Sequence, residues 1–272
     1  VLYYNLMAGL LRALGDSRTP LYFLIISSVL NVVLDVIMIR GFHSGVGGAA
    51  LATVISQLVS AVACHLYAVK RYPVLRPEKR YLKVECREAF AHLRIGVPMA
   101  LQFSVTAVGI MILQAYLNEY GALVVAGYTA AGKVENLVTQ PFNALALAME
   151  VYCGQNMGAG RKDRIRTGIR QALILTWIWS LGMILLSYTA SPWLIWLVTS
   201  SKNPVVLSNA SWYLKTDSLF YFAPAAISVL RNGLQGMGDH ITPVFSSLIE
   251  LIGKVICAFL LAHIFQYWGI IM

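Results

Sequence analysis

The sequence predicts an all-α polytopic membrane protein, and three observations carry this prediction. Hydrophobic residues make up 58% of the 272 residues and charged residues only 12%, against about 25% charged residues in an average soluble domain. The charged residues cluster between apolar runs, several of which reach the roughly 20 residues that a helix needs to cross a bilayer. The phrase Gly-Asp-x-x-Thr-Pro occurs twice, at 15–20 and 238–243, each time before such a run. This repeat indicates an internally duplicated chain, as in many secondary transporters.

The apolar runs predict the membrane-spanning helices in chain order. We expect membrane segments at 1–11, 20–40, 46–69, 90–117, 121–152, 167–190, 204–235 and 242–268. Pro98, Pro141 and Pro224 lie inside three of them and predict kinks, which membrane helices tolerate when neighbouring helices satisfy the freed backbone groups. The chain does not begin with Met and starts inside an apolar run, so we expect it to be a fragment of a longer protein.

The distribution of Lys and Arg predicts the orientation in the membrane. One set of loops, at 12–18, 70–94, 161–170 and Arg231, carries sixteen of the 21 Lys and Arg residues, whereas the alternate turns carry only Arg40 and Lys202. By the positive-inside rule the first set is cytoplasmic. Both Gly-Asp-x-x-Thr-Pro phrases then lie on the cytoplasmic side. The two halves therefore cross the membrane in the same direction, as a parallel repeat about an axis along the membrane normal.

Composition and spacing disfavour other classes of function. The formal net charge is +9, but the charge sits in loops rather than on one exposed face, which argues against a nucleic-acid partner. The four cysteines and five histidines show no metal-ligand spacing, and no nucleophile has a plausible base nearby. We therefore expect a protein that is not an enzyme and has no cofactor.

Asp35 is the most informative acid, because a carboxylate inside an apolar membrane helix is costly and usually functional. Asn31 lies four residues earlier on the same helix face. Asp35 and Thr53 are each nine residues from the midpoint of the intervening turn, so at 1.5 Å per residue both lie roughly 13 Å from it. Carboxylate, amide and hydroxyl oxygens suit a hard cation, and Asp alone suits a proton. The alternative is a structural acid that pairs with Arg40 or caps the turn.

The second half departs from this pattern. At the offset of 223 residues between the repeats, Asn31 aligns with Lys254. Glu250 lies four residues before Lys254, the favoured order for a helical ion pair, so a built-in ammonium would replace a bound cation there. This pair is either structural or part of the transport machinery. Other candidates for cleft or coupling residues are Gln102, Glu135 and Asn143.

Four phrases together resemble the multidrug and toxic compound extrusion (MATE) family. They are Leu-Arg-Ala-Leu-Gly-Asp-Ser-Arg-Thr-Pro at 11–20, Gly-Val-Gly-Gly-Ala-Ala-Leu-Ala-Thr at 45–53, Gly-Gln-Asn-Met-Gly-Ala-Gly-Arg at 154–161 and Leu-Arg-Asn-Gly-Leu-Gln-Gly-Met-Gly-Asp at 230–239. The third resembles the family's signature after its eighth helix. The family has twelve helices in two six-helix lobes around a central cleft. The resemblance implies that 1–70 is the C-terminal part of the first lobe (the end of helix 4 and helices 5–6), 71–89 a basic cytoplasmic connector and 90–272 the second lobe (helices 7–11). Helices 1–3 and 12 would be missing.

The resemblance also implies a site and a function. In family members of this type, a cation site is formed by Asn and Asp four apart on helix 5, a Thr on helix 6 and an Asp on helix 1. Asn31, Asp35 and Thr53 match three of these positions. Some members carry a cation-binding acid on helix 7, but the run at 95–117 contains none.

The implied function is a monomeric antiporter that uses Na⁺ or H⁺ to export amphipathic, often cationic, small molecules. Its partners would be this substrate and membrane lipid, and its location the inner (cytoplasmic) membrane of a bacterium or archaeon. The rival is a lipid-linked sugar or lipid flippase of the same two-lobe architecture. Several basic residues in the cleft would favour the flippase, and only Lys133, Lys215 and Lys254 are candidates.

Overall fold

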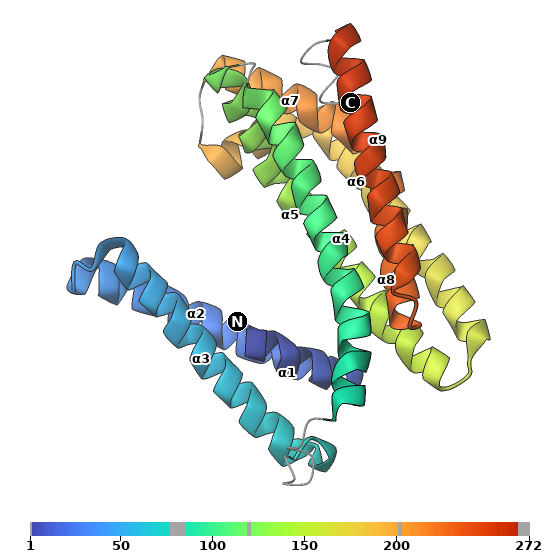
Figure 1. Cartoon of the computed structure of the whole chain (residues 1–272). Coiled ribbons are helices and arrows are strands. Elements are labelled where there is room, and N and C mark those ends of the chain that lie inside the picture. Colours follow the sequence, from blue (N-terminus) through green and yellow to red (C-terminus); the bar gives the residue numbers. More distant parts are fainter. Residues whose placement is uncertain (1, 77–84, 119–120, 201–202, 266–272) are drawn as a thin grey trace. The chain divides into compact units, whose positions relative to one another are not determined.

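The computed structural model describes residues 2–76, 85–118, 121–200 and 203–265. These residues form helices and their connections, with no strand among them (Figure 1). The all-α class predicted from the sequence is therefore confirmed. The chain divides into two compact units, residues 1–86 and 87–272.

The first unit is a helical hairpin with a preceding helix. Its elements are α1 (Leu2–Ala13), α2 (Arg18–Val36), the π-helical turn η1 (Ile37–Gly41), α3 (Gly45–Arg71) and the 3₁₀ turn η2 (Pro73–Leu75). Small polar side chains link α2 to α3: Ser27 donates to the Ser56 carbonyl at 3.0 Å, and Ser60 donates to the Phe23 carbonyl at 2.8 Å. Such small residues let two helices approach closely where both are surrounded by lipid.

The second unit is organised around one long helix, α5. Its elements are α4 (Cys86–Asn118), α5 (Ala122–Gly158), α6 (Lys162–Thr199), α7 (Pro204–Ser218), α8 (Phe222–Gly236) and α9 (Ile241–Phe265). Helix α5 packs against α6, α7 and α8. The α5–α8 approach is the tightest, because a Cβ built on Gly236 would lie 2.0 Å from the Glu150 carbonyl oxygen. Glycine is required there for two backbones to touch.

The predicted single segment at 204–235 is wrong, because the structure has two helices there. Helix α7 ends at Ser218 and α8 begins at Phe222. Pro224 explains the break: it has no N–H to donate to the Phe220 carbonyl, and its ring would clash with that carbonyl in a continuous α-helix. The chain instead makes bonds three residues back at the break, such as from Phe220 N–H to the Asp217 carbonyl at 3.0 Å.

The signature at 154–161 also differs from expectation. Helix α5 runs through its first five residues to Gly158 instead of ending before it. The turn comes at Gly160, whose φ of 68° lies in the left-handed region that favours glycine. There the Arg161 N–H donates to the Asn156 carbonyl at 2.8 Å, closing the helix end in a Schellman pattern. Helix α6 starts directly afterwards, at Lys162.

The two Gly-Asp-x-x-Thr-Pro phrases form corners with the same local geometry. Gly15 and Gly238 have φ of 90° and 93°. The N–H of Asp16 donates to the Leu11 carbonyl at 2.9 Å, and the N–H of Asp239 donates to the equivalent Leu234 carbonyl at 3.0 Å. Both phrases thus close one helix with a Schellman motif and start the next. The predicted relation of the two halves by a rotation about the membrane normal stays a prediction.

Four of the described helical segments are long and apolar enough to cross a membrane by length and composition. They are Arg18–Gly41, Gly45–Arg71, Cys86–Ala115 and Lys162–Thr199. The first exposes a nearly continuous apolar surface, for example at Leu24, Ile25 and Val29. Large apolar surface on helices of this length is typical of a lipid-embedded chain.

Candidate functional site

The candidate cation site lies between α2 and α3. The Asn31 Nδ2 amide donates to the Thr53 hydroxyl oxygen at 3.4 Å. The Thr53 hydroxyl in turn donates its own hydrogen to the Ala49 carbonyl at 3.0 Å, one turn earlier in α3. Because that hydrogen is used within the helix, the Thr53 oxygen has only its two lone pairs to offer, and one of them already accepts from Asn31. The hydroxyl can therefore serve as a neutral oxygen ligand.

The sequence predicted that Asp35 and Thr53 lie at the same depth in the membrane, and the way α2 and α3 pair corrects this prediction. The sequence placed Asp35 level with Thr53, but the contact that the structure shows is from Asn31 to Thr53. The bond from Ser27 to the Ser56 carbonyl, one turn away, follows the same register. The π-helical turn Ile37–Gly41 packs more residues into the corner than an α-helical turn holds. Asp35 consequently lies about one turn nearer the corner than Thr53.

The carboxylate of Asp35 is incompletely hydrogen-bonded in the described part of the chain. Its Oδ1 atom is buried and has no hydrogen-bond partner among the described residues. A buried carboxylate oxygen without a partner is costly, and the cost is removed when a proton or a cation binds. The predicted alternative partner, Arg40, forms no ion pair with Asp35 within the described residues and lies inside the π-helical turn. Such turns occur frequently at functional sites.

In the second unit, Glu250 is held between two cations. Lys254 Nζ lies 2.8 Å from Glu250 Oε1, so the ion pair expected from the sequence is present. Arg231 donates to the other carboxylate oxygen at 2.9 Å and to the Ser246 hydroxyl at 3.1 Å. The sequence grouped Arg231 with the loops, which is wrong, because it lies within α8; its cytoplasmic side stays a prediction. Arg231 and Glu250 are 19 residues apart on different helices, so no helical spacing in the sequence predicted their contact.

A second acidic cluster gathers where α7 ends. Tyr213 donates from its hydroxyl to Glu135 Oε2 at 3.0 Å, joining α7 to α5. One turn later in α7, Asp217 has a buried Oδ2 atom without a hydrogen-bond partner in the described part of the chain. The sequence had marked Glu135 and Asp217 as polar residues inside apolar segments, whereas nothing had marked Tyr213. The bond from Tyr213, four residues before Asp217, holds this part of α7 against α5.

The remaining candidates have different surroundings. Gln102 is 7% exposed, and its Oε1 accepts from Gln235 Nε2 at 2.8 Å, which ties α4 to α8. Asn143 lies on an exposed face of α5. Both belong to the second unit, whose other candidates form the two clusters around Glu250 and Glu135.

These features define a multi-pass α-helical membrane protein with acids, amides and hydroxyls inside apolar helices. A family model described as MatE matches residues 98–260. The chain therefore belongs to the multidrug and toxic compound extrusion family, as its motifs suggested.

Relatives and solved structures agree with this assignment. The chain is 29% identical over 261 residues to the "Probable multidrug resistance protein YoeA" of Bacillus subtilis (strain 168), covering 93% of the chain and 56% of that protein. It is 30% identical over 247 residues to the "Probable multidrug resistance protein YpnP" of the same organism, covering 91% and 55%. A crystal structure of a MATE transporter in complex with MaL6 superposes with a TM-score of 0.90 at 23% identity, over 99% of this chain and 62% of that one. The chain thus spans a little over half the length of these relatives.

Proposed function

We propose that the protein exports amphipathic, often cationic, small molecules, driven by entry of Na⁺ or H⁺ through a site at Asp35. The names of the relatives support multidrug export. The observation that carries the coupling is the buried Oδ1 atom of Asp35, which has no partner among the described residues. A cation is the chemical partner that such an oxygen lacks.

Asp35, Thr53 and Asn31 would each contribute differently to binding the coupling ion. Asp35 supplies the negative charge, and Thr53 supplies a neutral oxygen whose hydrogen is already committed to Ala49. Asn31 holds that oxygen in place through its Nδ2 and has a carbonyl oxygen left to offer. A bound ion or proton neutralises Asp35, so the two compete for one site. Occupancy drives transport only if the site has different affinities in the outward-open and inward-open states.

The flippase alternative receives less support. It requires free basic residues to face a phosphorylated lipid. Of the three candidates, Lys254 is paired with Glu250, whereas Lys133 and Lys215 form no ion pair within the described residues. The pairing of Lys254 reduces the positive charge available to an anionic headgroup. A multidrug exporter of cationic compounds does not need that charge.

The proposal is tested by drug efflux from proteoliposomes under an imposed Na⁺ or H⁺ gradient, using the complete protein. Asp35→Asn keeps the shape and removes the charge, so efflux driven by either gradient should fall to background while drug binding at equilibrium is retained. Drug binding is the control, because it reports an intact fold independently of coupling. Wild-type efflux by Asp35→Asn under both gradients would show that Asp35 is a structural acid.

A further inference from the structure

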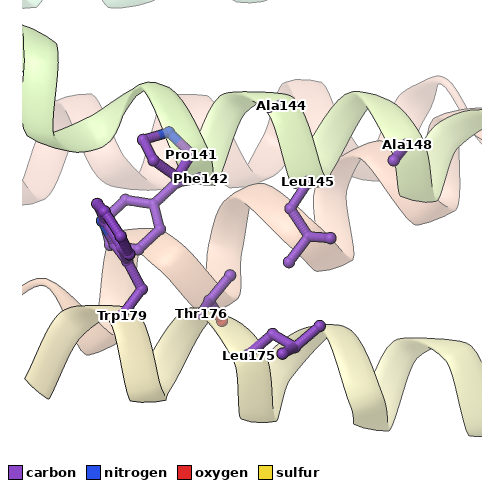
Figure 2. A pocket seen from close by; sticks show the side chains of 8 residues that line it. All are labelled: Pro141, Phe142, Ala144, Leu145, Ala148, Leu175, Thr176 and Trp179. Atoms are coloured by element: carbon purple, nitrogen blue, oxygen red, sulfur yellow. The ribbon is translucent and has the colours of Figure 1, made fainter. Parts of the chain in front are cut away.

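An apolar pocket of about 410 Å³ opens between α5 and α6, and no acidic side chain of the described residues lines it. Its lining residues are Pro141, Phe142, Ala144, Leu145, Ala148, Leu175, Thr176 and Trp179 (Figure 2). Leu145 points from α5 toward α6, and Thr176 points from α6 toward α5. The volume falls within the roughly 300–1,000 Å³ typical of ligand pockets.

The polar side-chain groups in the pocket wall already have partners. The Thr176 hydroxyl donates to the Leu173 carbonyl at 2.9 Å, and the Trp179 indole N–H donates to the Val138 carbonyl at 3.0 Å. The other lining side chains are hydrocarbon. A polar ligand would therefore lose its bonds to water and gain none, whereas a hydrocarbon chain loses nothing. The chemistry of the wall selects an aliphatic occupant.

The position of the pocket identifies the source of that chain. Ala148 lies ten residues before the end of α5, and Trp179 lies 17 residues after the start of α6. At 1.5 Å per residue, the pocket extends from about 15 to about 26 Å from the turn that joins the two helices. The charged first turns of α6, with Arg164, Arg166 and Arg170, lie outside the hydrocarbon, and the pocket lies beyond them beside the apolar part of the helix. We therefore expect it within the hydrocarbon core of the bilayer, which is about 30 Å thick. Leu175 and Trp179 are 57% and 39% exposed, so the side of the pocket is open in the described part of the chain.

The floor and one end of the pocket are built from fixed contacts. Phe142 is 4% exposed and meets the Tyr221 ring edge-on at 6.2 Å. Toward the joining turn, the Tyr152 ring lies 2.4 Å from the place where a Cβ on Gly168 would be, so the two helices close on each other there. Pro141 supplies no backbone N–H at the pocket's far end. The space is therefore closed below and at the end nearer the turn, and open at its side.

We propose that this recess is a binding site for one acyl chain of a bilayer phospholipid, held longer than the surrounding lipid. The apolar wall, the side opening and the depth carry this assignment. It does not depend on Asp35 or on coupled efflux.

Trp179 provides a reporter for the test, because bromine atoms on an acyl chain quench indole fluorescence on contact. The full chain is prepared with Trp179 as the sole tryptophan and, for comparison, with Trp177 alone, the other five being replaced by Phe. Trp177 is 44% exposed and does not line the pocket. Each protein is equilibrated in vesicles of dibrominated phosphatidylcholine and then diluted into excess unbrominated lipid.

The expected result is that Trp177 recovers its fluorescence at once, while Trp179 keeps part of its quenching and recovers slowly. Ala148→Phe fills the recess and should abolish the retained quenching, whereas Leu147→Phe, at the neighbouring exposed residue outside the lining, should not. Ala144→Phe gives the same test if Ala148→Phe does not fold. Equal, immediate recovery at both tryptophans would overturn the proposal. Retained quenching that survives every pocket-filling variant would also overturn it.

Discussion

The side-chain amide of Asn31 lies 3.4 Å from the Thr53 hydroxyl, across the interface between α2 and α3. This contact leaves Asp35 one turn nearer the corner, with a buried oxygen that has no partner in the described part of the chain. The three side chains thus divide into a bonded pair and an unpaired acid. Removing the hydroxyl and removing the charge should therefore have effects of different size.

Thr53→Val keeps the shape of the side chain and removes one neutral oxygen. The affinity for Na⁺ should fall roughly fivefold to tenfold, since a neutral polar contact contributes about 1–1.5 kcal/mol. Transport driven by a H⁺ gradient should change less, because a proton needs only the carboxylate. The measurement is the Na⁺ concentration that gives half-maximal efflux. Thr129→Val, at an exposed threonine of α5, is the control; an equal change in that control would contradict the assignment.

Gly236→Ala should destabilise the second unit. The added Cβ would lie 2.0 Å from the Glu150 carbonyl oxygen, so α5 and α8 must move apart. Overpacking of this kind costs about 1–3 kcal/mol. Gly132→Ala is the matched control, because a Cβ there meets nothing within 4 Å and alanine favours a helix. Thermal unfolding in detergent should show a lower Tm for Gly236→Ala alone. Equal Tm values for both variants would contradict the close α5–α8 approach.

Glu250→Gln should destabilise the protein more than Lys254→Met. Glu250 is the shared anion of Arg231 and Lys254, so its removal leaves two cations without their partner. The Arg231 side chain is only 14% exposed, and losing a hydrogen bond to a charged group costs on the order of 2 kcal/mol. Lys254 is 47% exposed and can reach water when unpaired. Thermal unfolding of both variants orders the two effects, and the reverse order would show that Lys254 is the essential member.

The second Gly-Asp corner should loosen as the pH falls. The hydroxyl and backbone N–H of Thr242 donate to Asp239 and hold the pKa of its carboxyl below its usual value. Since the folded pKa lies below the unfolded value of about 3.9, the stabilisation is complete above that pH and is lost as the pH falls through the folded pKa. Hydrogen exchange at the amides of 241 and 242, corrected for intrinsic rates, should therefore accelerate at low pH. Asp239→Ala should remove this step, and a step that persists in the variant would assign it to another group.

Much of the architecture could be predicted from the sequence. The length of an apolar run predicts a membrane helix, and the Lys and Arg residues of the loops predict its orientation. The same reasoning failed at the break after Ser218, where one proline among many apolar residues decides between a kink and two helices. It also failed for Arg231, whose position near a predicted helix end resembled that of a loop residue. Its partner Glu250 lies on another helix, and no local spacing encodes that contact.

In the candidate site, too, some features could be predicted from the sequence and others could not. The residue types and the i, i+4 spacing of Asn31 and Asp35 were available from the sequence, as was the proximity of Asn31 to Thr53. The relative depth was not, because the prediction assumed α-helical rise throughout the corner. The π-helical turn Ile37–Gly41 and the residues of the corner after it depart from that rise, and Asn31 rather than Asp35 meets Thr53. In the second unit, Asp217 joins Glu135 only because the chain folds α7 back along α5.

The most direct test of Asp35 as the coupling-ion ligand is equilibrium binding of Na⁺ to the purified complete protein. We expect the wild type to bind Na⁺ saturably and to lose it as the pH falls, because a proton competes for the same carboxylate. Asp35→Asn should abolish this binding. Asp217→Asn is the matched control, since Asp217 also has a buried oxygen without a partner in the described residues, and it should leave Na⁺ binding intact. Undiminished, pH-dependent Na⁺ binding by Asp35→Asn, with loss of binding in Asp217→Asn, would contradict the assignment and move the ion site to the second unit.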